Sequence, residues 1–152
     1  CEPGPAESPP PIDSAYNLLS AYTPYAAAKI DIMPLTEFIH ISGVEHASKI
    51  RVYVSLLDSF DCQIKSPAVF RFELYEHVRR SPQPKGRRVS IWPDVDLTGA
   101  AENNRYWRDY LRAYEFNLDF EPQSNQSYIL QVTYLCPNSK RLSDDFVLKY
   151  TK

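Results

Sequence analysis

The chain has 152 residues, of which 43% are hydrophobic and 24% are charged, so a single domain with its own core is expected rather than a disordered chain. Its formal net charge of −2 at pH 7 leaves no overall positive field to attract nucleic acid, and no run of about 18 apolar residues is present for a membrane-spanning helix. Eleven Tyr, seven Phe and two Trp beside four Gly favour β-strands.

Residues 1–14 predict an extended tether. The sequence opens on Cys1, and five of the 13 prolines lie within residues 1–11. Proline restricts φ and lacks an N–H, so this segment is expected to be extended and to hold the domain roughly 40 Å from its attachment point. A proline-rich ligand for an aromatic groove is less favoured, because no basic residue flanks Pro9, Pro10 or Pro11.

A leading cysteine followed by a polar, proline-rich segment resembles the N-terminus of a mature bacterial lipoprotein, from which the signal peptide has been removed. The resemblance implies that Cys1 carries fatty acids such as palmitate, and that the protein lies in the cell envelope, in the periplasm or on the outer membrane. Several acyl chains, each contributing about 0.8 kcal/mol per buried CH₂, would make a lasting anchor. The alternative is that position 1 only marks where the chain was cut.

Residues 15–152 predict one β-sandwich domain, because alternation of apolar and polar residues recurs along the chain. The alternating segments are residues 50–56, 70–75, 115–120 and 146–150. Residues 128–135 are apolar on both parities, which favours a central strand. Pro34 breaks an earlier segment into residues 30–35 and 37–41, which places it at a sheet edge or at a bulge, and residues 89–92 are expected to add a short strand.

One helix is expected at about residues 99–112. Tyr106, Trp107, Tyr110 and Leu111 would form its apolar stripe, Arg105 and Asp109 an ion pair, and Thr98 its N-terminal cap. A single short inserted helix among about seven strands predicts an all-β, immunoglobulin-like, transthyretin-like or C2-like sandwich.

The cysteine count predicts a disulfide. Setting Cys1 aside for lipid leaves Cys62 and Cys136, which both follow predicted strands. A bridge between them would add about 4 kcal/mol in the chain-entropy model and would imply an oxidising compartment. Two free thiols are the alternative.

No catalytic motif is present, so no catalytic residue, cofactor or metal site is predicted. The sequence lacks G-x-S-x-G, H-E-x-x-H, S-x-x-K and a glycine-rich phosphate loop, and His40, His46 and His77 stand in no recognised pattern. Three acidic pairs either bind Ca²⁺ at loop tips or serve as ordinary turn residues: Asp58 with Asp61, Asp94 with Asp96, and Asp144 with Asp145.

The strongest charge feature is a basic segment at residues 79–88. Its five cations are Arg79, Arg80, Lys85, Arg87 and Arg88. They predict either a site for an acidic partner or a long solvated hairpin loop, in which Pro82 and Pro84 prevent strand pairing.

These features together predict a non-enzymatic binding or assembly subunit, anchored by lipid and associated with protein partners in an envelope complex. The expected architecture is similar to that of small β-sandwich lipoproteins of secretion machines, such as the type VI secretion lipoprotein that grips an inner-membrane partner by its loops. A carbohydrate- or calcium-binding module is the first alternative, with Trp92, Tyr106 and Trp107 as a sugar-stacking surface, and a small hydrolase is the second.

Overall fold

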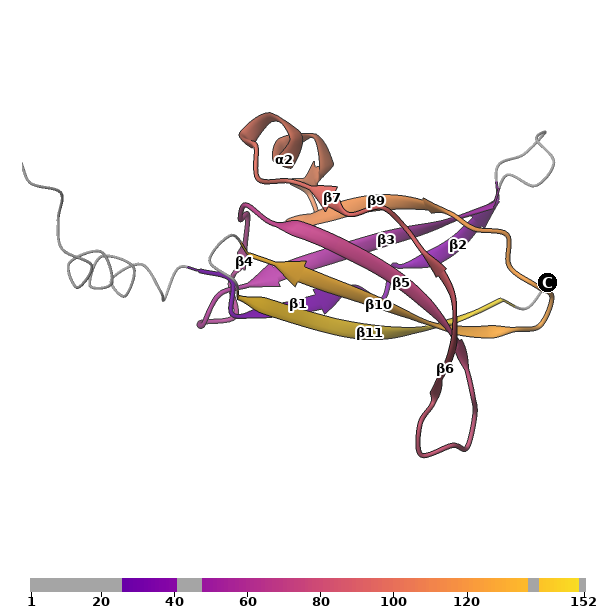
Figure 1. Cartoon of the computed structure of the whole chain (residues 1–152). Helices are drawn as coiled ribbons and strands as arrows, with labels where there is room; N and C mark the ends of the chain where they lie inside the picture. Colours follow the sequence, from indigo (N-terminus) through magenta and orange to yellow (C-terminus); the bar gives the residue numbers. More distant parts are fainter. Residues whose placement is uncertain (1–25, 41–47, 137–139, 151–152) are drawn as a thin grey trace, which may run out of the picture.

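The computed structural model describes residues 26–40, 48–136 and 140–150, which form two antiparallel β-sheets packed face to face (Figure 1). The predicted all-β sandwich is confirmed. Eight strands have four or more residues and three have only two, and a single short helix lies in the described part of the chain. Cys1 and the predicted tether of residues 1–14 lie outside the described residues.

The first sheet has the strand order β1-β3-β9-β8, with β2 and β4 also paired to β3. Its strands are β1 (Lys29–Ile32), β2 (Glu37–His40), β3 (Ser48–Leu57), β4 (Gln63–Ile64), β8 (Trp107–Arg108) and β9 (Ala113–Asp119). The second sheet has the order β11-β10-β5-β6, with β7 also paired to β5. Its strands are β5 (Val69–His77), β6 (Lys85–Ile91), β7 (Val95–Asp96), β10 (Ser127–Leu135) and β11 (Arg141–Lys149).

The core lies between the sheets and follows the alternation of the sequence. Every second residue of β3 from Ile50 to Leu56 is fully buried, and so are Phe70, Phe72 and Leu74 of β5. Phe70 and Phe72 meet Phe116 of β9 across the interface, with ring centroids 5.1 and 4.7 Å apart. Large aromatic side chains therefore fill the space between the two sheets.

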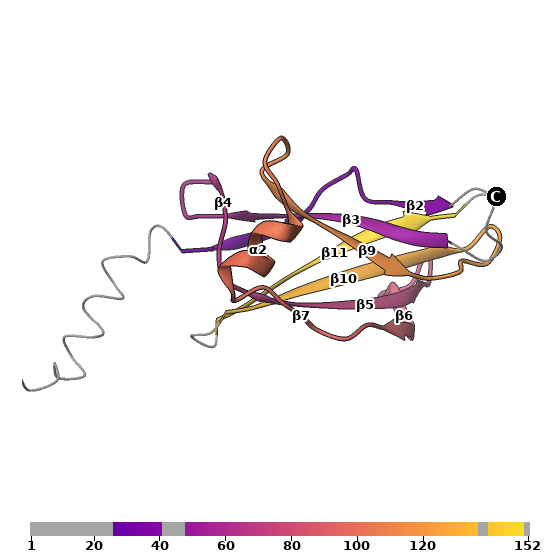
Figure 2. The same cartoon turned by 90° about the horizontal axis from the view of Figure 1, so that it is seen from above.

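Two predictions about strand position are confirmed. The segment around Pro34 is divided into β1 and β2, which both pair with β3 and form one edge of the first sheet (Figure 2). β10 lies between β11 and β5, as expected for a strand that is apolar on both parities.

The predicted helix of residues 99–112 is too long. Helix α2 covers only Ala100–Tyr106, and Trp107 turns into an extended conformation and pairs with Tyr114. The pairing buries the Trp107 indole against the Tyr114 ring, at a centroid distance of 5.1 Å, which a continued helix would not allow. Tyr110, expected in the apolar stripe, is 76% exposed.

The ion pair and the N-terminal cap predicted for that helix are also different in the structure. Arg105 forms an ion pair with Glu102 instead of Asp109, because the helix ends before residue 109. The N-terminal cap is Gly99, without a side-chain hydrogen bond, while the Thr98 hydroxyl donates to Asp96 at 2.6 Å.

The two ends of the sandwich carry different elements, a helix at one end and a projecting hairpin at the other. The near end is where β1 begins at Lys29, and α2 packs there. The far end is where β5 ends at His77, and the β5–β6 hairpin projects there from the second sheet (Figure 1). We call the hairpin of residues 75–88 the arm.

Candidate functional site

The five predicted partner-binding cations all lie on the arm at the far end. Arg79 and Arg80 occupy the turn after β5, whereas Lys85, Arg87 and Arg88 belong to β6. The expectation of a long solvated loop is therefore wrong for residues 85–88, which pair with β5, and the N–H of Val78 donates to the carbonyl of Pro84 at 2.7 Å. Pro82 and Pro84 lie in or at the end of the turn, where their missing N–H groups remove no ladder bond.

Most of these cations have partners within the chain. Arg87 pairs with Glu76 and Arg88 with Glu73, each at 2.9 Å. Arg79 donates to the Ser127 hydroxyl at 2.9 Å. Arg80 is exposed at the turn and has a positive φ of 59°. The four arginines of the arm are exposed, with the Arg87 side chain at 79%, whereas Lys85 is half-buried.

Lys85 holds the arm against the outer face of the second sheet. Its ammonium group donates to Gln131 at 2.9 Å and to Asp145 at 3.2 Å, and it lies 5.2 Å from the centroid of the Tyr75 ring. These contacts join β6 to β10 and β11 across β5. Sequence reasoning did not identify this set, because the partners of Lys85 are distant in sequence.

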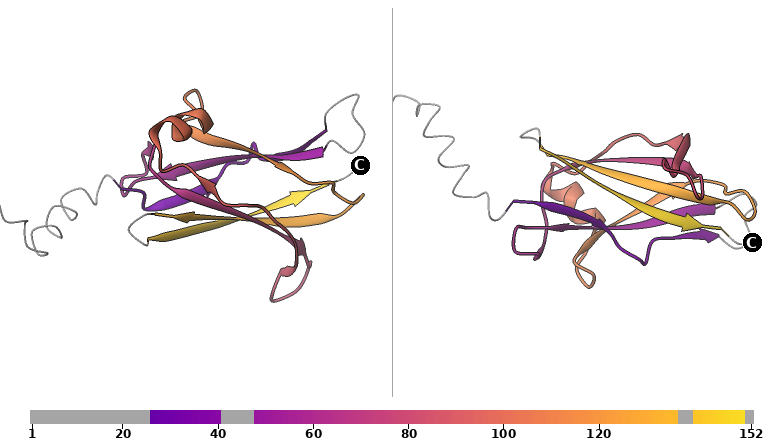
Figure 3. Two further views of the ribbon diagram at one scale, coloured as in Figure 1. Left: turned by 45° about the horizontal axis from the view of Figure 1, so that its top comes forward. Right: turned by 90° about the horizontal axis from the view of Figure 1, so that it is seen from below.

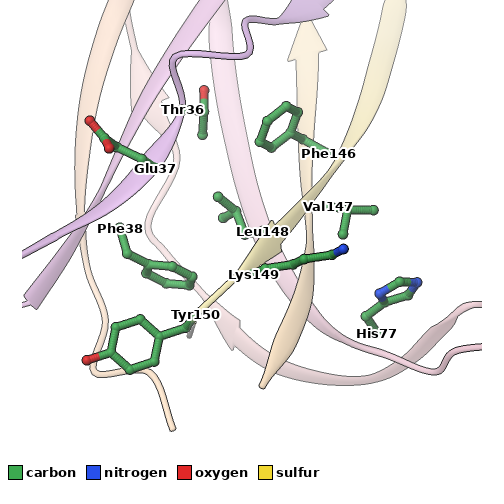
Figure 4. Close-up of a pocket in the computed structure, with 9 residues that line it drawn as sticks. All are labelled: Thr36, Glu37, Phe38, His77, Phe146, Val147, Leu148, Lys149 and Tyr150. Carbon is green, nitrogen blue, oxygen red and sulfur yellow. The ribbon is translucent and has the colours of Figure 1, made fainter. Parts of the chain in front are cut away.

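An open groove lies at the far end, between β2 of the first sheet and β11 of the second (Figure 4). Its volume is about 710 Å³, and its residues are Thr36, Glu37, Phe38, His77, Phe146, Val147, Leu148, Lys149 and Tyr150. Phe38 and Tyr150 meet edge to face, with ring centroids 5.5 Å apart. The buried Nδ1 atom of His77 has no hydrogen-bond partner among the described residues. The groove is thus an aromatic opening between the two sheets.

Toward the near end, the edges of the two sheets are joined by a hydrogen bond between β1 and β11. The N–H of Ile32 on β1 donates to the Asp144 carboxylate of β11 at 2.9 Å. Partial burial raises the pKa of Asp31, and the negative charge of Asp144 raises it further. A raised pKa means that Asp31 favours the folded state when protonated and loses that contribution as the pH rises through its folded pKa.

We expect Asp31→Asn to raise the unfolding temperature slightly at pH 7, because the amide removes both the cost of partly burying a charge and the repulsion from Asp144. The gain over the original chain should shrink as the pH falls toward 3.8, the ordinary pKa of the carboxyl group, where Asp31 itself becomes protonated. Thermal unfolding of both proteins at several pH values measures this difference. A variant that is less stable at pH 7 would contradict the assigned repulsion.

The predicted disulfide is not present. Cys62 and Cys136 are both free thiols, Cys62 exposed and Cys136 half-buried. Cys62 belongs to a turn whose N–H groups at Phe60 and Cys62 donate to the Asp58 carboxylate, at 2.8 and 3.0 Å. Cys136 follows β10 of the second sheet, whereas Cys62 follows β3 of the first sheet.

A buried polar network joins α2 to both sheets at the near end. The Asn103 side-chain amide donates to the carbonyls of Ser66 and Leu97, at 2.9 and 3.0 Å, and its oxygen accepts from the Tyr114 hydroxyl at 2.8 Å. The Ser66 and Tyr134 hydroxyls lie 3.1 Å apart. Burial raises the pKa of Tyr134 to about 12, so this phenol stays neutral at ordinary pH. The network has a structural role, since it satisfies groups that packing has buried.

The acidic pairs weighed as calcium ligands are engaged within the chain. Asp58 binds its own turn, Asp61 pairs with Lys29, Asp144 binds Ile32, and Asp145 pairs with Lys85. Asp94 accepts two bonds from Arg71, and Asp96 accepts bonds from Thr98. In residues 26–40, 48–136 and 140–150, no three His, Cys, Asp or Glu side chains come close enough to share a metal ion.

The aromatic residues weighed as a sugar-stacking surface pack in different places. The Trp92 indole donates to the carbonyl of Asp119 and meets Phe120. Tyr106 packs on Phe116, and Trp107 on Tyr114. These three rings pack in or against the core and do not form one shared surface.

Comparison with known proteins finds no matching family model and no matching curated protein. Across the described residues, no helix combines the length and apolar character needed to span a bilayer. The arm and the groove are therefore assessed from their own chemistry.

Proposed function

We propose that the protein is a non-enzymatic binding or assembly subunit, held at the bacterial cell envelope by lipid on Cys1, that contacts a protein partner with its arm. The observation that supports this proposal is the placement of the arm. The described chain enters the sandwich at the near end, and the arm projects at the far end (Figure 1). A tether attached at Cys1 would therefore present the arm away from the anchor.

The arm has the properties of a preformed contact surface. Ion pairs from Arg87 and Arg88 and the three contacts of Lys85 hold the hairpin in one position, which lowers the entropy lost on binding. Arg79 and Arg80 extend from its turn beside Val78, whose side chain is exposed. Exposed guanidinium groups beside an apolar side chain suit an acidic protein surface with an apolar spot.

Site-specific crosslinking in the native envelope tests the partner contact. We expect a photoreactive amino acid at Arg80 to crosslink to a protein partner. The same group at Tyr110, which is 76% exposed in the turn between β8 and β9, should give no such product. Changing Arg79 and Arg87 together to Glu, in the chain that carries the probe at Arg80, should abolish the product. Equal crosslinking from both positions, or none at Arg80, would contradict the contact.

Intact mass of the native protein tests the anchor separately. We expect the mass to exceed that of the chain by several acyl groups, all located on the peptide that contains Cys1. An unmodified Cys1 thiol, or further residues before Cys1, would overturn the envelope placement. The contact by the arm would still be decided by the crosslinking experiment.

A further inference from the structure

β11 is an outer strand of the second sheet (Figure 3), so half of its backbone N–H and C=O groups point away from that sheet. At the two ends of the β10–β11 pair, Tyr150 donates its N–H to Gln126, and Cys136 donates to Lys140, each at 2.9 Å. Together with the register between them, these bonds show that the even-numbered residues of β11 bond to β10. The N–H and C=O groups of residues 143, 145, 147 and 149 therefore face outward.

The far half of this edge is the accessible half. Near Asp144, β1 lies against β11 through the Ile32 bond. From Phe146 onward the groove opens. Leu148 lies on the buried face of β11, and Val147 lies on the exposed face at the margin of the groove (Figure 4). Val147 is 44% exposed, with charged residues two positions away on either side. A strand could add here by the backbone bonds used in β-augmentation.

Two copies of residues 145–149 are complementary when they run antiparallel to each other. In an antiparallel pair centred on Val147, Asp145 of one copy lies opposite Lys149 of the other, and Val147 lies opposite Val147. On the inner side, Phe146 lies opposite Leu148. Each outward-facing residue would be opposite another outward-facing residue, which is the arrangement required for a hydrogen-bonded antiparallel pair.

We propose that a second copy of this chain pairs with the far half of β11, through a two-fold axis at Val147, and joins the second sheets of two molecules into one continuous sheet. The two pairs of Asp145 with Lys149 set the register, and the Val147 contact lies between them. The partner's strand runs past the mouth of each groove. This inference does not rest on the lipid anchor or on a partner of the arm, although Asp145 also pairs with Lys85 of its own chain at 3.2 Å.

Other registers and occupants fit less well. A two-fold axis at Asp145 would oppose two aspartates and would set Arg141 against Lys149. An axis at Ser143 would bring the second copy to the half of the edge where β1 approaches. An unrelated extended peptide would use the same backbone groups, but it would not need the charges of Asp145 and Lys149.

Sedimentation velocity of the 152-residue chain, with a reductant present to prevent disulfides between copies, tests the proposal. We expect the original chain to form a dimer. Lys149→Asp opposes two aspartates and Asp145→Lys opposes two lysines, twice in each dimer, so each variant should raise the dissociation constant at least about tenfold. Lys149→Asp is the primary variant, because Asp145→Lys also removes the ion pair with Lys85. An equimolar mixture of the two variants restores both opposite-charge pairs, and we expect it to form a heterodimer.

Arg80→Asp is the matched control, because it makes the same charge change on the exposed turn of the arm, where aspartate tolerates the positive φ of 59°. This control should remain a dimer, and circular dichroism should show all variants folded. A monomeric original chain at every concentration, a Lys149→Asp variant that dimerises normally, or a mixture that stays monomeric would each overturn the proposal.

Discussion

Replacing Phe70 with alanine should lower the free energy of unfolding by about 3–5 kcal/mol, the usual cost of removing a buried aromatic ring. Phe70 is fully buried, and its ring lies within 6.5 Å, between centroids, of those of Phe72, Tyr114, Phe116 and Tyr134. The cavity would be bounded by both sheets, whose backbones are held by their own hydrogen bonds and cannot close it. Urea denaturation, monitored by circular dichroism, measures the loss.

Phe60→Ala is the matched control for this prediction. Phe60 lies in the turn after β3 and is 72% exposed, so its loss should change the unfolding free energy by no more than about 0.5 kcal/mol. The Phe60 N–H bond to Asp58 is retained, because it belongs to the backbone. Similar losses from the two substitutions would contradict the placement of Phe70 at the centre of the core.

Asn103→Ala should lower the unfolding free energy by about 2–3 kcal/mol, because it leaves several buried groups without a partner. The side chain supplies two donated bonds and one accepted bond, and it links α2 to the carbonyls of Ser66 and Leu97 and to the Tyr114 hydroxyl. A protease should also cut the segment around α2 faster in this variant, since the helix has seven residues and depends on packing for its stability.

Asn104→Ala, one position further along the same helix, is the control. Asn104 is exposed, and its side-chain oxygen accepts a bond from Lys65 at the surface. Both substitutions raise helix propensity similarly, so the difference between them reports the buried bonds alone. Equal stability of the two variants would show that Asn103 does not hold α2 in place.

The residues expected to determine stability lie apart from the two proposed contact surfaces. The largest expected losses arise from Phe70 in the core and from the network around Asn103 at the near end. The arm and the outer edge of β11 lie toward the far end and contribute exposed side chains and outward-facing backbone groups. Substitutions at Arg80 or Lys149 can therefore test contacts with little risk to folding.

The strand assignments were predictable because each strand of this sandwich buries one face. The period of two in residues 50–56 and 70–75 matches the observed burial of Ile50 and Phe70 and the residues that alternate with them. The position of Pro34 at a sheet edge followed from its missing N–H. These are local consequences of side-chain alternation and backbone chemistry.

The errors occurred where local patterns had two structural solutions. Tyr106 and Trp107 are apolar neighbours that suit a helix stripe, yet Trp107 gains a strand partner in Tyr114 and a buried position. Cys62 and Cys136 satisfied the cysteine count, but each belongs to its own turn or strand end. In both cases the competing solution depends on residues that are distant in sequence or on the exact path of a turn.

The sequence by itself determined the β class, the apolar face of the main strands and the concentration of cations in residues 79–88, because these depend on composition and on a period of two. Only the tertiary structure decided that Lys85 would bind Asp145, that Asn103 would be the buried residue of α2, and that the backbone groups of the odd-numbered residues of β11 would point away from the sheet. Such contacts join segments far apart in the chain, and their geometry depends on how the two sheets pack and on the register between strands.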